Sequence, residues 1–176
     1  TRDMVHSTIS AKYNSLKNVG NLNNQFGVPL TLFNLNKDHE CAVIEMGMDK
    51  KGEIDYLTKI VNPDVAVITN IGMSHIMNFP NGQEGIFEAK TEIVNGLKEN
   101  GLLIVNGDDE YLKTLKNNKH SYRLLTYGFK ENNDIICKNY EIKESLINFT
   151  CIYNNQEYNF SISSPAKHNI GNAMIA

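Results

Sequence analysis

The sequence predicts an α/β fold: a mostly parallel β-sheet flanked by helices, with a small antiparallel β part near the carboxyl end. Uninterrupted apolar runs recur along the first two thirds of the chain, as in "CAVIEMG", "DVAVITN" and "GLLIVNGDD". Such runs are typical of strands buried on both faces. Segments with helical spacing separate them, which indicates crossover connections between parallel strands. From about residue 134 apolar and polar residues alternate instead, as in antiparallel strands with one wet face.

The first 61 residues predict a helix, a loop, a second helix, a strand and a third helix. Val5, Ile9, Tyr13 and Leu16 recur at helical spacing and predict one face of the first helix. The loop "NVGNLNNQFG" is rich in Asn and Gly, and Pro29 follows where a first helical position is expected. The strand "CAVIEMG" and the helix "EIDYLTKIV" complete this part.

The rest of the chain continues the alternation and then changes character. "DVAVITN" predicts a second buried strand, and the loop "IGMSHIMNFPNG" leads to an amphipathic helix over residues 84–97. A third strand "GLLIVNGDD", a short helix "EYLKTLKN" and a fourth strand "YRLLTYG" follow. The predicted antiparallel strands are "DIICKNYEI", "LINFTCIY" and "EYNFSIS", and "KHNIGNA" opens a last helix.

Composition narrows the class of protein. At 176 residues, 41% hydrophobic and 21% charged, the chain suits one globular domain, or one domain and a small appendage. A net charge of −3 without a basic block argues against nucleic acid as the main partner. No apolar run approaches the roughly 20 residues of a membrane span, and no signal peptide opens the chain.

The cysteines and the two ends of the chain give two further expectations. Cys41, Cys137 and Cys151 are odd in number and widely spaced, which fits neither a disulfide framework nor a zinc site. We therefore expect reduced thiols and a cytoplasmic protein. The chain opens inside one helical pattern, without an initiator Met, and stops inside another, so we expect a piece of a longer protein.

Polar side chains stand where the predicted parallel strands end. Glu45 closes the first of these strands, Asn70 the second and Asn106 the third, with Asp108 and Asp109 just beyond. Each position alone also fits strand termination by turn-forming residues. Because ligands of open α/β sheets bind beyond the carboxyl ends of the strands, the recurrence predicts a site at that edge.

Glu45 and His75 have side chains that suit a metal–phosphate site. A carboxylate that closes a buried strand, as Glu45 does before Gly47, resembles the acidic Mg²⁺ ligand of P-loop nucleotide enzymes. The alternative is an ion-paired or capping Glu. His75 lies in the loop five residues beyond Asn70, and it is either a neighbour of Glu45 or an ordinary surface histidine.

Lys90 lies on the apolar stripe of the helix over residues 84–97. It follows Ile86 by four residues and precedes Ile93 by three. A packed stem with its ammonium reaching water explains this placement. The other hypothesis is a desolvated amine of lowered pKa, which can add carbon dioxide and become a carbamate that binds a hard metal.

The segment "KHNIGNA" places polar groups in the first turn of the last helix. Asn169 and Asn172, after His168, are three residues apart. Either Asn can cap backbone donors, and the two together can bind the edge of a base through their amides.

Six motifs in order resemble those of the Mur ligase family. They are "GNLNNQFGVPLTLFNL", "AVIEMGMDKKGEI", "PDVAVITNIGMSH", "EGIFEAKTEIV", "VNGDDEYL" and "KHNIGNA". The resemblance covers essentially the whole chain as the central, ATP-binding domain. The "GNLNN", "GVPLT" and "EMGM" variants are similar to those of the member that joins D-alanyl-D-alanine to UDP-N-acetylmuramoyl-tripeptide.

The resemblance implies an ADP-forming amide ligase of peptidoglycan precursor synthesis that uses ATP and Mg²⁺. ATP would phosphorylate the peptide carboxylate, and the amine of D-alanyl-D-alanine would attack the acyl phosphate. The implied metal residues are Glu45, His75 and Lys90, the last as a carbamate. The implied nucleotide-binding residues are Asn169, Asn172, Asn70 and Asp109, and the implied substrate-facing residues are Asn23, Asn24 and Thr31.

The chain also departs from the family pattern. The family's Gly-rich phosphate loop ending Gly-Lys-Thr would lie immediately before "TRDM" and is not in this sequence. Met77 stands where an acidic residue is common, and Ala166 where Gly is usual. We therefore expect no catalysis from these 176 residues alone. The alternatives are a non-catalytic nucleotide- or peptide-binding module and another Mur-like ligase, such as a cyanophycin-synthetase-like protein.

The resemblance implies a division of the chain and a set of partners. Residues 1–176 would be the central domain, truncated at both ends. Residues 1–133 would form the parallel part, 134–164 the antiparallel appendage, and 165–176 the start of a helix that returns to the nucleotide site. The partners would be the two substrates and the protein's own N-terminal and C-terminal domains.

Overall fold

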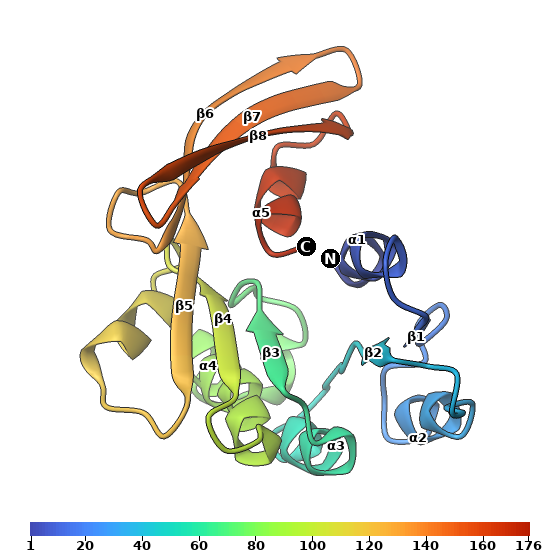
Figure 1. Ribbon diagram of the computed structural model, residues 1–176. Coiled ribbons are helices and arrows are strands. Elements are labelled where there is room, and N and C mark those ends of the chain that lie inside the picture. The colour runs from blue at the N-terminus through green and yellow to red at the C-terminus, as the bar shows by residue number, and fades with distance from the viewer.

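The structure is a computed structural model that describes residues 1–176, and it contains two β-sheets (Figure 1). A small parallel sheet pairs β1 (Ser15–Lys17) with β2 (Cys41–Val43). The larger sheet has six strands in sequence order. They are β3 (Val65–Ile68), β4 (Leu102–Asn106), β5 (Arg123–Gly128), β6 (Ile135–Lys143), β7 (Leu146–Tyr153) and β8 (Gln156–Ser163).

Helices connect the strands and cover them. The α-helices are α1 (Arg2–Ser10), α2 (Gly27–Leu32), α3 (Glu53–Val61), α4 (Gln83–Thr91) and α5 (His168–Met174). The 3₁₀ helices are η1 (Ile76–Asn78), η2 (Glu92–Gly96) and η3 (Leu112–Asn117). No helix combines the length and the apolar character needed to cross a membrane.

The six-stranded sheet confirms the predicted α/β class with an antiparallel part. Strands β3 to β6 are parallel, and β6, β7 and β8 are antiparallel. The two parts are joined where Tyr127 and Gly128 of β5 pair with Ile135 and Ile136 of β6. The antiparallel strands therefore continue the parallel sheet, and they curve over α5 (Figure 1).

The main core lies between the parallel strands and the helices α3 and α4. Leu103 and Val105 of β4, the strand between β3 and β5, are fully buried, and Ile86 and Ala89 of α4 belong to the same cluster. A second core packs α5 on the antiparallel strands. It contains Cys137, Ile147, Phe149, Cys151 and Ile170.

The helix predicted over residues 84–97 divides into α4 and η2 at Thr91. Beyond this division η2 comes close to α3, because a side chain at Gly96 would come within 2.3 Å of the Thr58 backbone. The Thr58 hydroxyl also donates a hydrogen bond of 2.8 Å to the carbonyl of Ile93. The backbone of η2 thus lies directly against α3, and the sequence pattern alone carries no sign of this contact.

Three other local predictions were wrong. Helix α1 ends at Ser10, so Tyr13 lies outside it and Leu16 belongs to β1. Strand β2 is not buried on both faces: Ala42 is exposed, and the strand pairs only with β1. Pro29 is the third residue of α2 rather than the first.

The buried thiols give a test of the second core. Cys137 and Cys151 are about 4% and 3% exposed, whereas Cys41 is only half-buried. Burial raises the pKa of both buried thiols, that of Cys151 to about 12 with a further contribution from Cys137. Because the thiolate is the reacting species, we expect Ellman's reagent at pH 8 to modify Cys41 quickly and the other two only after denaturation.

The matched control for this titration is Cys41→Ser, which should remove the fast phase and leave the slow one. Three thiols that react at one rate in the native protein would contradict the packing of α5 on β6 and β7.

Candidate functional site

A cleft of about 680 Å³ lies between β2 and β3. Each of these strands pairs with a neighbour on one side only, β2 with β1 and β3 with β4. Apolar residues of both strands, among them Ala42, Val43, Val65 and Ile68, line the cleft. The polar residues that line it include five of the predicted site residues: Asn23, Glu45, Asn70, His75 and Lys90.

Glu45 is held at both its backbone and its side chain. The Asn18 side chain accepts a hydrogen bond from the Glu45 N–H at 3.0 Å and donates one to the Glu45 carbonyl at 2.8 Å. The Asn23 amide donates to one carboxylate oxygen at 2.8 Å, and the Arg2 guanidinium lies 3.6 Å from the other. The carboxylate therefore has a fixed direction while its side chain stays 44% exposed.

His75 lies in the loop that follows β3, directly before η1. It adopts a left-handed backbone conformation with φ of 61°, which is uncommon for a residue other than glycine. Its Nδ1 is 3.1 Å from a carboxylate oxygen of Asp49, in the loop that follows Glu45. The Asn78 amide donates to the main-chain oxygen of Asp49 at 3.0 Å. These contacts hold the loop beyond β2 against the loop beyond β3.

Lys90 reaches from α4 to the carboxyl end of β3. Its ε-amino group donates a hydrogen bond of 2.7 Å to the main-chain oxygen of Asn70. Partial burial lowers the pKa of Lys90, and the nearby charge of Asp109 opposes this shift. Its position on the apolar stripe therefore directs the amine into the cleft.

Asp109 does not line the cleft but binds the backbone at Ile71, between the lining residues Asn70 and Gly72. One of its carboxylate oxygens accepts a hydrogen bond from the Ile71 N–H at 2.8 Å. The other accepts from the N–H groups of Tyr111 and Leu112 at the start of η3. Both oxygens are thus used by backbone donors, as in a helix cap.

The predicted substrate-facing residues have different surroundings. Asn24 accepts hydrogen bonds from the N–H groups of Phe26 and Gly27 and so caps the start of α2. Thr31 is buried, and its hydroxyl donates to the carbonyl of Gly27 at 2.8 Å. Only Asn23 of the three lines the cleft.

Asn169 and Asn172 lie together on α5, close to the start of α1. The Asn172 amide donates to the Asn169 oxygen at 2.9 Å, and the Asn169 amide donates to the Ser164 hydroxyl at 2.6 Å. The Thr1 hydroxyl donates to the Asn172 oxygen at 2.5 Å. The two ends of the chain therefore lie side by side (Figure 1), and Thr1 also lines the cleft.

The donor atoms of the cleft fit a metal only together with further ligands. No three His, Cys, Asp or Glu side chains come close enough to hold an ion by themselves. Mg²⁺ commonly takes one or two protein carboxylates and completes its shell with phosphate oxygens and water. Glu45 offers one such carboxylate, so the cleft fits a metal–phosphate complex rather than a free ion.

Sequence reasoning missed Asn18 and Arg2. Asn18 is fully buried and contacts Glu45, and the Arg2 guanidinium donates to the carbonyl of Gly20 at 2.7 Å beside the Glu45 carboxylate. Nothing in the pattern separates Asn18 from the other asparagines of its loop. Arg2 lies at the start of a helix, where a basic residue has no expected role.

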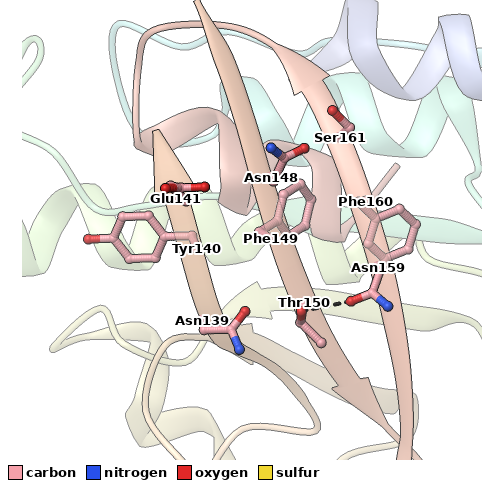
Figure 2. A pocket seen from close by; sticks show the side chains of 9 residues that line it. All are labelled: Asn139, Tyr140, Glu141, Asn148, Phe149, Thr150, Asn159, Phe160 and Ser161. Atoms are coloured by element: carbon pink, nitrogen blue, oxygen red, sulfur yellow. Dashed lines mark hydrogen bonds between the residues drawn. The ribbon is translucent and has the colours of Figure 1, made fainter. Parts of the chain in front are cut away.

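A second hollow, of about 590 Å³, lies on β6, β7 and β8 away from the predicted residues (Figure 2). Polar side chains of the three strands line much of it, and the Thr150 hydroxyl donates to the Asn159 oxygen at 2.8 Å. Glu141 is the one acidic residue in its lining. The hollow lacks the convergence of charged and polar groups at strand ends that marks the cleft, so we place the candidate site in the cleft.

Comparison with known protein families shows to which family the chain belongs. The profile described as the Mur ligase middle domain matches residues 1–176, the whole chain. The chain belongs to the Mur ligase family.

Similar proteins and structures agree with this placement. The UDP-N-acetylmuramoyl-tripeptide–D-alanyl-D-alanine ligase of Bacillus subtilis is 44% identical over 176 residues, which is 100% of this chain and 37% of that protein. MurF from Acinetobacter baumannii superposes with a TM-score of 0.91 at 34% identity, over 98% of this chain and 38% of that one. MurF from Thermotoga maritima in complex with ADP gives 0.86 at 28% identity, over 98% of this chain and 40% of that one. The chain thus spans about two fifths of the length of these Mur ligases.

The lowered pKa of Lys90 can be measured in this Mur ligase domain. After reductive ¹³C-methylation, we expect the Lys90 signal to titrate below pH 10.5, the usual value for a lysine. Because the folded protein then holds this proton more weakly than the unfolded one, it should gain stability relative to Lys90→Met as pH rises from the folded pKa to 10.5.

The Lys90→Met variant assigns the Lys90 signal by its disappearance. If that signal titrates at 10.5 or above, the amine is not desolvated in the cleft.

Proposed function

We propose that this chain is the middle domain of an ATP-dependent ligase that joins D-alanyl-D-alanine to UDP-N-acetylmuramoyl-tripeptide in peptidoglycan precursor synthesis. The observation that carries the proposal is the cleft, where Glu45, Asn70, His75 and Lys90 meet at the carboxyl ends of β2 and β3. The 44% identity to the Bacillus subtilis ligase of that name supports it.

In this proposal the reaction is a phosphoryl transfer followed by an acyl transfer. The terminal carboxylate of the tripeptide attacks the γ-phosphorus of ATP and becomes an acyl phosphate, with ADP as the leaving group. The amine of D-alanyl-D-alanine then attacks the acyl carbon, and inorganic phosphate leaves as the amide forms. Such transfers need positioning and charge neutralisation more than covalent chemistry by the protein.

Glu45 and His75 would hold Mg²⁺ at the cleft. Bound there with the nucleotide, the ion would neutralise charge on the phosphoryl group. Glu45 suits this role because its carboxylate is oriented by Asn23 and remains open to the cleft. His75 suits it because the contact with Asp49 brings its loop towards the end of β2.

We further propose that Lys90 acts as a carbamate. Partial burial lowers its pKa and so increases the neutral amine fraction that can add carbon dioxide. The resulting anion would lie beside Asn70 and add a negative charge to the metal side of the cleft.

The nucleotide would lie between this cleft and α5. The amides of Asn169 and Asn172 bind each other, Ser164 and Thr1. Each amide nitrogen has a second N–H and each oxygen a second lone pair, and these suit the edge of an adenine. Asn70 would face the phosphates directly. Asp109 would act indirectly, since both its oxygens hold backbone N–H groups.

The peptide substrate would approach Asn23 at the mouth of the cleft. Asn24 and Thr31 would act indirectly, because their hydrogen bonds fix the start of α2, which follows Asn23 in the chain. The C-terminal and N-terminal domains of the longer protein would complete the substrate sites. We place this ligase in the cytoplasm, with neither nucleic acid nor membrane as partner.

The cleft also suits a strand from the longer protein. The facing edges of β2 and β3 are unpaired, and an unpaired edge is a ready template for another strand. We infer that a strand carrying the Gly-rich phosphate loop fills the cleft and delivers the loop to the start of α1, where a helix N-terminus favours phosphate.

The test is ligation by the full-length protein. With ATP and Mg²⁺ it should convert UDP-N-acetylmuramoyl-tripeptide and D-alanyl-D-alanine into the pentapeptide product, detected by mass spectrometry. Glu45→Gln should lower kcat/KM by about 100-fold or more, because one oriented charge is lost. The exposed Glu99→Gln is the matched control and should leave the rate unchanged.

Residues 1–176 alone are the second control and should form no ADP. A full-length protein that binds both substrates and forms neither ADP nor product would favour a non-catalytic binding module instead. Ligation of another amino acid or peptide in preference to D-alanyl-D-alanine would favour another Mur-like ligase.

The carbamate has its own test. Lys90→Ala in the full-length protein should lose activity by about 100-fold or more, and added short carboxylates such as acetate or formate should restore part of it. Glu45→Gln should show no such rescue. A Lys90→Ala variant with undiminished activity would defeat the carbamate role.

A further inference from the structure

We propose that Asn18 is a positioning residue that aims the Glu45 carboxylate at the metal. The proposal rests on the proposed function, since it takes Glu45 as a metal ligand. Asn18 is fully buried and touches neither the metal nor a substrate in this scheme. It acts through Glu45 alone.

One side chain holds the whole main chain of Glu45. The Asn18 oxygen accepts a hydrogen bond from the Glu45 N–H at 3.0 Å, and its amide donates to the Glu45 carbonyl at 2.8 Å. Backbone pairing between β1 and β2 ends at Lys17 and Val43. The Asn18 side chain therefore continues the hydrogen bonding beyond the β1–β2 ladder and binds the main chain two residues past the end of β2.

This hold decides the direction of the carboxylate. Successive side chains of an extended chain point to opposite faces, so a rotation of the Glu45 peptide would turn its side chain out of the cleft. An amide that binds both the N–H and the C=O of one residue prevents that rotation. A single hydrogen bond would allow the peptide to turn about it.

Asn18 also fixes the partner of the Glu45 side chain. Its amide donates a second hydrogen bond, of 2.8 Å, to the carbonyl of Leu22. The next residue, Asn23, donates to the Glu45 carboxylate at 2.8 Å and accepts from the Gly47 N–H at 2.7 Å. The contacts form a closed ring through Asn18, Leu22, Asn23 and Glu45.

Gly47 leaves the room that this ring needs. A side chain at Gly47 would come within 3.0 Å of the Asn23 amide, so a larger residue would push that amide from the carboxylate. The loop, the strand end and the carboxylate are therefore one unit centred on Asn18. We expect its loss to weaken metal binding beyond any loss of stability.

The experiment measures metal binding by the full-length protein in the presence of ADP, with Mn²⁺ as the probe and the free Mn²⁺ signal in electron paramagnetic resonance as the readout. Asn18→Leu keeps the branched shape of the side chain, with somewhat larger groups, but removes all three hydrogen bonds. We expect it to raise the Mn²⁺ Kd about 10-fold, the lower end of the effect of removing a residue that orients a ligand. Amide hydrogen exchange at Glu45 should become faster.

Thr58→Val is the matched control, because it also removes a hydrogen bond of a fully buried side chain, the one from Thr58 in α3 to Ile93, which does not involve Glu45. It should lower the thermal midpoint without changing the Mn²⁺ Kd. An equal rise of the Kd in Thr58→Val and Asn18→Leu would overturn the proposal, because it would trace the effect to lost stability.

Two further variants separate this proposal from the proposed function. Glu45→Gln should weaken Mn²⁺ binding, and Asn18→Leu added to it should weaken binding no further. If Glu45→Gln leaves binding unchanged, the metal role of Glu45 fails and this proposal fails with it. If Glu45→Gln weakens binding while Asn18→Leu does not, this proposal alone is overturned. Should Asn18→Leu not fold, Asn18→Asp is read in the same way, because it loses both donors.

Discussion

Two adjacent carboxylates, Asp108 and Asp109, hold the carboxyl edge of the large sheet together. Asp109 accepts a hydrogen bond from the Ile71 N–H in the loop after β3. Asp108 accepts hydrogen bonds from the N–H groups of Phe129 and Lys130 in the turn after β5. The short loop after the central strand β4 therefore reaches both neighbours. Charged acceptors strengthen such bonds, and the positions of the loops at the cleft follow from them.

The other wall of the cleft is attached by weaker means. No strand pairing joins β2 to β3. The links between the two walls include the contact of His75 with Asp49 and the ion pair of Lys51 with Glu88 at 2.6 Å, all on exposed side chains. Contacts between exposed charged side chains contribute little to stability. The width of the cleft therefore depends little on these contacts, which suits a space that a further strand and a nucleotide would occupy.

Sequence patterns predicted the strands of the large sheet to within one or two residues. A continuous apolar run indicates a strand buried on both faces, and an alternating run indicates a strand with one face in water. They failed at β2, because a strand that lines an open cleft can carry the same apolar run as a strand buried on both faces. They also missed the division of the helix at Thr91, beyond which Gly96 of η2 lies against the Thr58 backbone. For the site, the rule of strand carboxyl ends brought Glu45 and Asn70 to one cleft.

Hydrogen-bond partners are what sequence could not supply. Thr31 and Asp109 have the side chains of binding residues, yet the structure uses them to hold backbone groups. Asn18 is the reverse case. Nothing in the sequence distinguishes it from the other asparagines of its loop, yet its side chain binds the Glu45 main chain. The same amide or carboxylate can bind a ligand or hold a backbone group. Which of the two it does depends on the groups that surround it in the folded protein, and the sequence does not give these.

Lys90 combines these constraints in one side chain. Burial on the stripe of α4 disfavours the ammonium, while the hydrogen bond to the Asn70 carbonyl and the charge of Asp109 favour it. Desolvation is the larger effect, so the pKa falls, but the remaining partners keep the amine directed at the end of β3. An exposed lysine would lack the shift, and a fully buried one would lack access to the cleft. The intermediate position gives Lys90 both a weakened hold on its proton and a fixed direction towards the residues at the strand ends.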